Sequence, residues 1–340
     1  MSGRAATDAA VDDRDGAAPR LSVVLITENE ADRIETCLDS VFAACRRAVP
    51  SFEVILVDSA STDETVERAS DYPITIERIP AEHTVSCGAG RYVGDAAARG
   101  DLTLHVDGDM ELTEEWLARA AAYLRDHDDV AAVEGCLDES DQDGVVDVDK
   151  VGGCMLYDAA ALESVGGFDP WLVGYEDVDA GYRLSTAGYR LVRLPDVSAV
   201  HPTGDGLSEP LRRWRMGYYF ASGQTMRKSL DSPRMLAKLL ARQRYKAGLF
   251  GWLLLGLAVL PRRRALAGWV GGSLVAFAAL AALRGPAGAA RFTVRKCLGL
   301  AGVPVGLAKE ARDPETFPLE AVERVRTGPI HGRQRAAESG

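Results

Sequence analysis

Two aspartates separated by one glycine, Asp107-Gly108-Asp109, follow the apolar run Leu102–Val106. The run predicts a buried strand, and the glycine lets the backbone turn tightly between two carboxylates at the end of that strand. Hard cations such as Mg²⁺ prefer oxygen ligands, usually a few carboxylates together with phosphate oxygens of a bound substrate. The triplet therefore predicts a site for a divalent cation, and the plain alternative is a solvated acidic turn.

Other apolar runs of strand length alternate with helix-like segments along the same part of the chain. They are Leu21–Ile26, Phe52–Val57 and Ile74–Ile79. Continuous apolar strands that alternate with helices predict an α/β fold with a parallel sheet covered on both faces. Ligands bind such sheets beyond the carboxyl ends of the strands. Thr27–Glu30, Asp58 and the aspartate triplet all fall at that edge, so we expect them to share one site.

Six short motifs occur in a fixed order along residues 21–205. They are Thr27-Glu28-Asn29-Glu30, Asp58-Ser59-Ala60-Ser61-Thr62-Asp63, Gly90-Arg91-Tyr92-Val93-Gly94, Asp107-Gly108-Asp109, Gly166-Gly167-Phe168-Asp169 and Glu176-Asp177. Taken together they resemble an inverting glycosyltransferase of family 2 with a GT-A fold. The third motif usually reads A-R-N-x-G in that family, so Tyr92 stands in place of an asparagine. The resemblance covers a little over half the chain and implies a GT-A catalytic domain over residues 20–210.

The resemblance implies that the first three motifs bind a nucleotide-diphospho-sugar donor. Thr27, Glu28, Glu30 and Asp58 would contact the nucleoside, because carboxylates accept hydrogen bonds from base N–H and ribose hydroxyl groups. Arg91 would contact the diphosphate, because a guanidinium pairs well with phosphate oxygens. The alternative for Glu28 is a charge at a helix N-terminus, and the alternative for Arg91 is a surface ion pair.

The same resemblance implies Mg²⁺ or Mn²⁺ between the protein and the donor diphosphate. The predicted protein ligands are Asp107, Asp109 and His201. Imidazole suits Mn²⁺ better than Mg²⁺, and the alternative for the histidine is a structural role. Asp107 and Gly108 also belong to the predicted donor-binding set. Gly166 and Gly167 would let the backbone approach the sugar or phosphate closely, and their alternative is an ordinary turn.

Asp177 is the predicted general base of the reaction that the resemblance implies. Inverting transfer is one in-line displacement, so the acceptor hydroxyl must lose its proton on the face opposite the leaving group. Residues Gly174–Leu184 predict a loop that enters a helix, which would place Asp177 near the helix N-terminus. Glu176 would set the position of this carboxylate or contact the acceptor. Asp179 competes for the role of base, and a plain helix cap is the alternative for Asp177.

Charge divides the chain into two parts of opposite sign. Residues 1–210 hold 16 basic and 43 acidic side chains, and residues 211–340 hold 23 basic and 7 acidic side chains, within a net charge of −11. The first part is too acidic to bind nucleic acid. Its acidity is typical of proteins in a high-salt cytoplasm, and it suggests a halophilic archaeal source.

The beginning of the chain and its cysteines indicate a cytoplasmic catalytic domain. Met1–Pro19 predicts a disordered acidic tail, and its polar start predicts no signal peptide. The six cysteines form no C-x-x-C pair and no metal-binding spacing. They therefore predict reduced thiols in a cytoplasmic domain.

The basic part predicts a membrane-associated region that begins with an amphipathic interfacial segment over residues 211–246. Arg212, Arg213, Trp214 and Arg215 combine cations with an aromatic ring, which suits a membrane interface and anionic lipid. We expect these four residues to contact a lipid-linked acceptor, whose phosphate an arginine can bind.

Residues 247–310 predict hydrophobic membrane helices. Their apolar runs are Ala247–Pro261, Ala265–Leu283 and Leu298–Ala308, of which the second is long enough to cross a bilayer. A spanning hairpin would place Arg262-Arg263-Arg264 outside, against the positive-inside rule, whereas interfacial or re-entrant helices would keep these arginines cytoplasmic. A soluble helical subdomain is the alternative. Residues 311–340 predict a polar C-terminal tail.

These features predict a metal-dependent inverting glycosyltransferase at the cell membrane, with its catalytic domain in the cytoplasm. The predicted acceptor is a polyisoprenyl-linked or dolichyl phosphate-linked glycan in cell-surface glycan or protein N-glycan assembly, as in similar archaeal and bacterial enzymes. A nucleotidyltransferase is one alternative, although Thr27–Arg33 lacks the Gly-rich loop that such enzymes usually carry after the first strand. A non-catalytic membrane-bound nucleotide-sugar binder is another.

Overall fold

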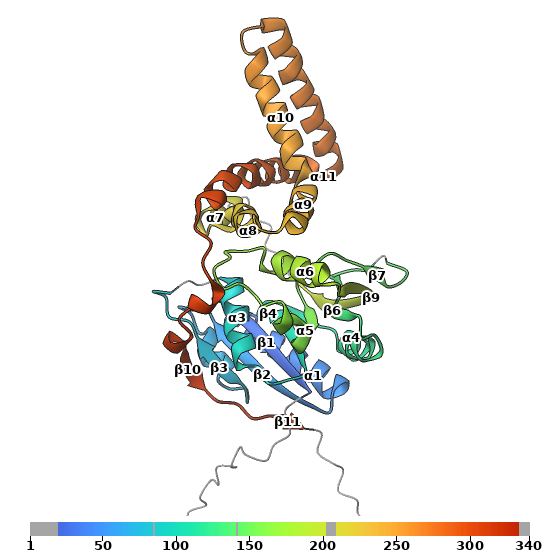
Figure 1. Ribbon diagram of the computed structural model, residues 1–340, viewed down its shortest axis with the longest axis vertical. Helices are drawn as coiled ribbons and strands as arrows, with labels where there is room; N and C mark the ends of the chain where they lie inside the picture. Colours follow the sequence, from blue (N-terminus) through green and yellow to red (C-terminus); the bar gives the residue numbers. More distant parts are fainter. Residues whose placement is uncertain (1–19, 84–85, 141, 202–208, 333–340) are drawn as a thin grey trace, which may run out of the picture.

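The computed structural model describes residues 20–83, 86–140, 142–201 and 209–332. The predicted disordered tail over residues 1–19 lies outside the described residues. Figure 1 shows an α/β domain, a layer of short helices above it, and a pair of long helices that projects away from that layer. The acidic part of the sequence thus supplies most of the α/β domain, and most of the basic part forms the helices above it.

The α/β domain is built on a mixed sheet with the strand order β10-β3-β2-β1-β4-β8-β6-β9-β5. Four neighbouring strands are parallel: β3 Thr75–Arg78, β2 Ser51–Asp58, β1 Leu21–Thr27 and β4 Leu102–Asp107. They confirm the four apolar strands predicted from the sequence. The third of these, predicted over Ile74–Ile79, is β3 in the structure. The remaining strands of this domain are β5 Glu111–Leu112, β6 Val130–Leu137, β7 Val146–Asp147, β8 Met155–Asp158 and β9 Arg190–Val200.

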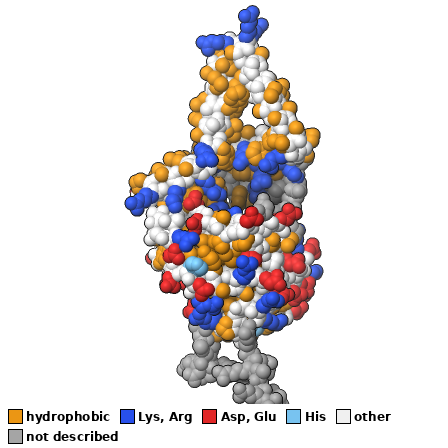
Figure 2. Space-filling model, turned by 90° about the vertical axis from the view of Figure 1, so that its right-hand side faces the viewer, with side chains coloured by type: hydrophobic (Ala, Val, Ile, Leu, Met, Phe, Trp, Pro, Cys, Tyr) orange, Lys and Arg blue, Asp and Glu red, His pale blue; other side chains and the backbone are white. Residues whose placement is uncertain are grey.

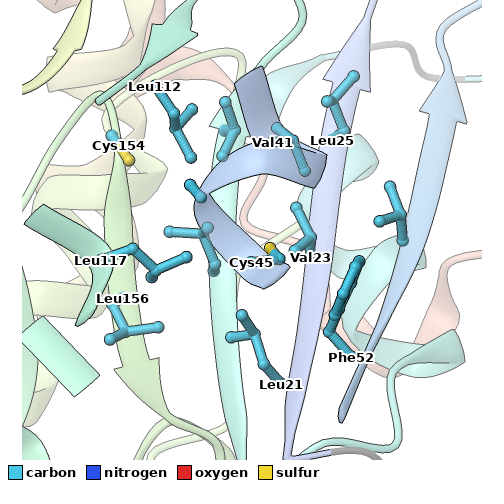
Figure 3. Close-up of a cluster of buried hydrophobic side chains, with 14 of the residues drawn as sticks. Leu21, Val23, Leu25, Val41, Cys45, Phe52, Leu112, Leu117, Cys154 and Leu156 are labelled. Carbon is cyan, nitrogen blue, oxygen red and sulfur yellow. The ribbon is translucent and has the colours of Figure 1, made fainter. Parts of the chain in front are cut away.

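Helices cover both faces of the sheet because alternate residues of a strand point to opposite faces. Leu21, Val23 and Leu25 of β1 belong to one buried cluster with residues of α1 Ile34–Ala48 and α4 Glu114–Asp126, part of which Figure 3 draws. On the other face, residues of β2 pack against α3 Cys87–Ala97. The other helices of this domain are α2 Thr65–Ala69, α5 Ala159–Ser164 and α6 Glu176–Ala187. All six cysteines are free thiols, as predicted.

Short helices form the layer above the domain, and two long helices project from it (Figure 1). The layer comprises α7 Glu209–Arg215, the 3-10 turn η1 Tyr218–Phe220, α8 Ala221–Lys228 and α9 Pro233–Arg242. The long helices are α10 Arg244–Val259 and α11 Arg263–Ala308. Gly285 has a φ of 73° and Pro286 follows it, so α11 bends there into a first segment, 263–284, and a second segment, 286–308.

The first segment of α11 lies antiparallel to α10, and we call this pair the hairpin. The rings of Trp252 and Trp269 stack across it with centroids 5.8 Å apart. Among the described helices, α11 is long and apolar enough to cross a membrane. Large apolar side chains face outward from the hairpin, such as Leu274, 64 % exposed, and Val275, 71 % exposed. Figure 2 shows this apolar exterior rising above the charged α/β domain.

The second segment of α11 packs tightly on η1 and α8 through glycines. A Cβ on Gly302 would lie 2.2 Å from the Tyr219 carbonyl oxygen, and one on Gly306 would lie 2.0 Å from that of Phe220. Only a residue without a side chain permits such an approach of two backbones. This contact anchors α11 to the layer that covers the α/β domain.

The prediction of a polar C-terminal tail over residues 311–340 is wrong for residues 311–332, because this segment contains two strands of the sheet. β10 Glu323–Arg326 adds an antiparallel edge strand to β3, and β11 His331–Gly332 pairs with β2. Arg324 Nε donates to Glu77 Oε1 across that edge, at 2.6 Å. The segment looks like a tail in the sequence because an edge strand keeps its charged side chains in solvent.

Candidate active site

The predicted edge residues lie side by side at the carboxyl ends of three parallel strands. Thr27 of β1 is the register partner of Asp58 of β2, and Ile26 is the partner of Asp107 of β4. The loops that follow these strands therefore meet in one place, as the sequence predicts. This shared edge is the geometric basis of the site.

Gly108 allows the turn between the two aspartates to pack directly against β1. Its N–H donates to the Ile26 carbonyl oxygen at 2.8 Å, and a Cβ at this position would lie 2.9 Å from Thr27 Cβ and Oγ1. A larger residue would push the turn away from the strand, because the atoms in its way belong to a buried side chain and to backbone. The close contact thus determines where Asp107 and Asp109 emerge.

Arg91 joins the aspartate turn to the N-terminus of α6. Its Nη2 lies 2.8 Å from Asp107 Oδ1 and its Nη1 lies 2.8 Å from Glu176 Oε1. The guanidinium is buried, so it does not form the surface ion pair considered from the sequence, and its predicted contact with the diphosphate stays untested. α3 carries it to this point because Gly94 packs against Val24 of β1. Charge-assisted bonds of this kind are strong and orient both carboxylates.

The second aspartate of the turn has histidine and arginine neighbours. His201 Nε2 lies 3.1 Å from Asp109 Oδ2, and Arg33 Nη1 lies 3.7 Å from the same oxygen. Burial alone raises the pKa of Asp109, but the hydrogen bond and charge of His201 outweigh it, so the pKa lies below its ordinary value. Burial and the charge of Asp109 raise the pKa of the nearby Glu30. Asp138 accepts a bond from the His201 backbone N–H at 2.7 Å.

The donor set suits a hard divalent cation in part. Asp109 and His201 lie together, whereas Asp107 directs Oδ1 to Arg91, and the described residues contain no group of three or more metal-ligating side chains. The predicted ligand set of Asp107, Asp109 and His201 is therefore not assembled as a cage. Mg²⁺ sites commonly use one or two carboxylates and take their remaining ligands from substrate phosphates and water. The residues present fit such a substrate-completed site.

Asp177 lies in the first turn of α6, beside a lysine that the sequence did not indicate. Lys150 Nζ is 2.6 Å from Asp177 Oδ2, and the Val178 backbone N–H donates to Oδ1 at 2.8 Å. The carboxylate is partly exposed, as a proton acceptor must be. Asp179, the predicted competitor, is fully buried between Arg183 and Lys228, so it is unsuited to meet an acceptor.

The residues predicted to bind the nucleoside occupy two environments. Asp58 is buried and accepts from the Ser61 backbone N–H at 3.1 Å, with Arg78 Nε 3.3 Å away, so it orders its own loop. Thr27 is buried beside it. Glu28 is exposed at the same strand edge. Contact between a nucleotide and these residues stays a prediction, and Glu28 is the most exposed carboxylate among them, with Glu30 partly buried.

Gly166 and Gly167 form a turn after α5 with φ values of 85° and 61°. Arg183 binds this turn, with Nη2 2.6 Å from the Gly167 carbonyl oxygen. Arg183 belongs to the middle of α6 and its side chain stabilises the backbone of this turn. The structure thus supports the interpretation of both glycines as an ordinary turn. Their predicted contact with sugar or phosphate stays untested.

Non-glycine residues with left-handed backbone gather around the site. Among the described residues they are Asn29, Ala60, Asp138 and Tyr175, with φ between 58° and 64°. Each lies in a loop beside a site residue, and Tyr175 directly precedes Glu176 and Asp177. Such conformations cost free energy and persist where surrounding contacts enforce them, which is common at functional sites.

The four predicted acceptor residues lie on α7. Arg212 and Arg215 are exposed, Arg213 lies over the Tyr218 ring at 5.2 Å, and Trp214 packs on the Phe220 ring at 5.0 Å. Arg213 and Trp214 therefore pack within the helical layer. Any contact that they make with lipid would be in addition to this packing. The structure does not bring the four residues into the carboxylate cluster that comprises Asp107, Asp109, Glu176 and Asp177.

Burial raises the pKa of Glu176 to about 7, although Arg91 lowers it, and Asp177 adds to the rise. A glutamate with a raised pKa binds its proton more tightly in the folded state, so the free energy of unfolding falls as the pH rises from about 4.5 to about 7. We expect Glu176→Gln to remove this contribution, which amounts to about 3 kcal/mol at most. Thermal unfolding of both proteins in metal-free buffer at several pH values measures it. A difference between them that stays constant across this range would contradict the assignment.

The chain is similar to known proteins in sequence and in fold. Residues 22–164 match the model of Glycosyl transferase family 2. A PGL/p-HBAD biosynthesis glycosyltransferase of Mycobacterium bovis is 36 % identical over 127 residues, which cover 35 % of this chain and 47 % of the relative. Glycosyltransferase AglE of Haloferax volcanii is 24 % identical over 208 residues, which cover 54 % of this chain and 67 % of AglE. The chain thus spans about half the length of the mycobacterial relative.

The fold has a solved counterpart. The mannosyltransferase PcManGT of Pyrobaculum calidifontis, solved with GDP-Man and Mn²⁺, superposes with a TM-score of 0.60 at 22 % identity, covering 87 % of this chain and 89 % of that one. This likeness concerns the fold alone. The family match ends before Glu176, so the roles given to α6 depend on its geometry. The chain has the GT-A fold, and its residues 22–164 match the model of glycosyl transferase family 2.

Proposed function

We propose that the chain is an inverting glycosyltransferase that moves a sugar from a nucleotide-diphosphate donor to a lipid-linked acceptor. The observation that carries the proposal is the Arg91 bridge between Asp107 and Glu176. It holds the turn expected to face the donor diphosphate beside the helix that bears Asp177. A displacement at the anomeric carbon needs these two groups on opposite sides of one small space.

Each residue of the cluster has a part in that displacement. Asp177 accepts the proton of the acceptor hydroxyl, while the Lys150 ammonium at 2.6 Å fixes the orientation of the carboxylate. Glu28 faces the nucleoside from the end of β1. Asp109 and His201 would hold Mg²⁺ or Mn²⁺, which neutralises charge on the departing nucleoside diphosphate. The Mn²⁺ and GDP-Man in PcManGT support a metal and a nucleotide sugar for this fold, and leave the choice of metal, nucleotide and sugar open.

The family match favours this transferase over the nucleotidyltransferase and the non-catalytic binder considered from the sequence. The likeness to AglE supports an archaeal glycan enzyme, and cell-surface or protein N-glycan assembly is the pathway class that we favour. A halophilic source accords with the acidic α/β domain.

The hairpin supports a membrane location, and the cytoplasmic side of the α/β domain is proposed from the sequence alone. Soluble monomers rarely expose such large contiguous apolar surfaces, whereas lipid covers them readily. At 1.5 Å per residue α10 is about 24 Å long, which is short for a hydrocarbon core of about 30 Å. The first segment of α11, at about 33 Å, is long enough. A polyisoprenyl or dolichyl phosphate carrier would lie in the same membrane, directly above the carboxylate cluster.

Full-length protein and a panel of nucleotide sugars with Mn²⁺ or Mg²⁺ test the proposal. We expect one donor to give a glycosylated product with an isoprenoid phosphate fraction of membrane lipid, detected by mass spectrometry. We also expect the protein to need detergent for extraction. Transfer to soluble acceptors alone, from protein that stays in the supernatant without detergent, would refute the lipid-linked acceptor.

A further inference from the structure

A cavity of about 700 Å³ lies between the helical layer and the second segment of α11. Six basic residues line it: Arg242, Lys246, Arg284, Arg291, Arg295 and Lys296. None of the described residues that line it is acidic. Figure 2 shows Lys and Arg side chains gathered at the base of the hairpin, where the apolar helices meet the α/β domain. A cavity with this lining is suited to an anion of high charge.

The kink in α11 creates the cavity. Gly285 turns the chain so that the second segment of α11 crosses over the layer instead of extending the hairpin. Arg291 and Arg295 are four residues apart on that segment and share one face, next to Lys296. The same kink places Arg284, at the end of the first segment, on the rim. A straight α11 would carry these cations away from α9 and α10.

Lys246 is a buried cation in this cavity with a neutral hydrogen-bond partner. Its side chain is 6 % exposed, and its Nζ lies 2.7 Å from the hydroxyl Oγ of Ser222. A hydroxyl is a neutral partner, and a buried ammonium without a carboxylate or phosphate is costly. Aromatic rings hold the adjacent Lys296, whose Nζ is 4.0 Å from the Tyr245 centroid and 5.1 Å from that of Phe292. The cavity is therefore built to hold positive charge in place.

The cavity adjoins the catalytic cluster on one side and the hairpin on the other. Tyr175, which lines it, immediately precedes Glu176 and Asp177 in the chain. Tyr218 also lines it, and burial followed by the charges of those two carboxylates raises the pKa of its phenol. A ligand head in the cavity would thus lie next to the general base, with its apolar chain free to follow the hairpin.

We propose that this cavity binds the phosphate or diphosphate head of an isoprenoid lipid that carries the acceptor. This assignment depends on the proposed function, and it moves the acceptor phosphate from Arg212, Arg213 and Arg215 of α7 to cations of α9, α10 and α11. An anionic head neutralises the lysines and arginines, and the neighbouring hairpin supplies an apolar path for the isoprenoid chain. Binding there would present the acceptor hydroxyl to Asp177.

The test uses full-length protein in phosphatidylcholine nanodiscs that contain a polyprenyl phosphate. We compare Lys246→Gln and Lys296→Gln with Arg263→Gln, a control that removes one charge at the hairpin tip, away from the cavity. We expect each cavity variant to weaken polyprenyl phosphate binding about tenfold, or about 1.4 kcal/mol. We expect the KM for acceptor in an isoprenoid phosphate fraction of membrane lipid to rise equally. We expect the dissociation constant of the donor to stay unchanged. The exposed control should match the wild type in both measurements.

Further measurements identify the ligand of the cavity and distinguish the cavity assignment from the proposed function. Binding to phosphatidylglycerol nanodiscs without polyprenyl phosphate that equals the binding of polyprenyl phosphate would show a general lipid contact. Binding of inorganic pyrophosphate with the same affinity would show a site for soluble anions. Either result overturns the assignment. Turnover with wild-type binding and acceptor KM in Lys246→Gln and Lys296→Gln also overturns it. Cavity-dependent binding of polyprenyl phosphate, with no sugar transfer to an isoprenoid phosphate fraction of membrane lipid, upholds the cavity and refutes the proposed function. Lys296→Gln, at a less buried position, keeps the test decisive if Lys246→Gln does not fold.

Discussion

Replacing Asp109 with asparagine is expected to lower kcat/KM for sugar transfer by about a thousandfold, or about 4 kcal/mol of transition-state stabilisation. The Asp109 carboxylate sits beside His201 at 3.1 Å and has a pKa below its ordinary value, so it is ionised at neutral pH. An amide is a neutral and weaker ligand for a hard divalent cation. Initial rates over a range of Mn²⁺ concentrations would show the loss, together with a higher metal requirement.

Two comparisons make this result specific to the site. Asp71→Asn changes an exposed aspartate away from the cluster and should leave turnover within about twofold of the wild type, since surface substitutions rarely have large effects. Chelation by EDTA should abolish transfer, and added Mn²⁺ or Mg²⁺ should restore it. Turnover that survives both chelation and the double change Asp107→Asn with Asp109→Asn would disprove the metal-assisted chemistry.

Asp177→Asn is expected to reduce kcat by about 10³-fold while the donor still binds, because general base catalysis typically contributes 10²–10⁴-fold. The isosteric amide keeps the size of the side chain next to Lys150 but cannot accept the acceptor proton. Donor binding measured by calorimetry, combined with single-turnover transfer, separates the two effects. A non-catalytic nucleotide-sugar binder would show no turnover in either protein.

Asp179→Asn provides the contrast for this second prediction. Asp179 is fully buried and its Oδ2 is 2.9 Å from both Arg183 and Lys228. Loss of its charge leaves two cations with a weaker partner, so it should lower the melting temperature more than Asp177→Asn does. If Asp177→Asn keeps wild-type turnover while Asp179→Asn loses it in folded protein, the base is wrongly assigned.

The order of motifs and the period of apolar residues were sufficient to predict the GT-A fold and the edge where the site lies. The apolar runs of β1, β2 and β4 predict parallel strands, and the register of Thr27 with Asp58 follows from pairing those strands. These features are local, because strand periodicity and turn-forming residues act over a few neighbours. The same locality explains why the aspartate turn was recognisable: strand, glycine and both carboxylates lie within eight consecutive residues of the sequence.

Packing between distant segments decided the rest. The partners of Arg91, the Lys150 contact with Asp177 and the burial of Asp179 join loops and helices that the sequence keeps far apart. The cationic cavity exists only because a kink at Gly285 folds α11 back over the layer. Residues such as Arg295 and Arg324 look alike in the sequence as solvated charges. One lines the cavity and the other bonds to Glu77 at a sheet edge, since long-range contacts depend on how whole elements pack rather than on neighbouring residues.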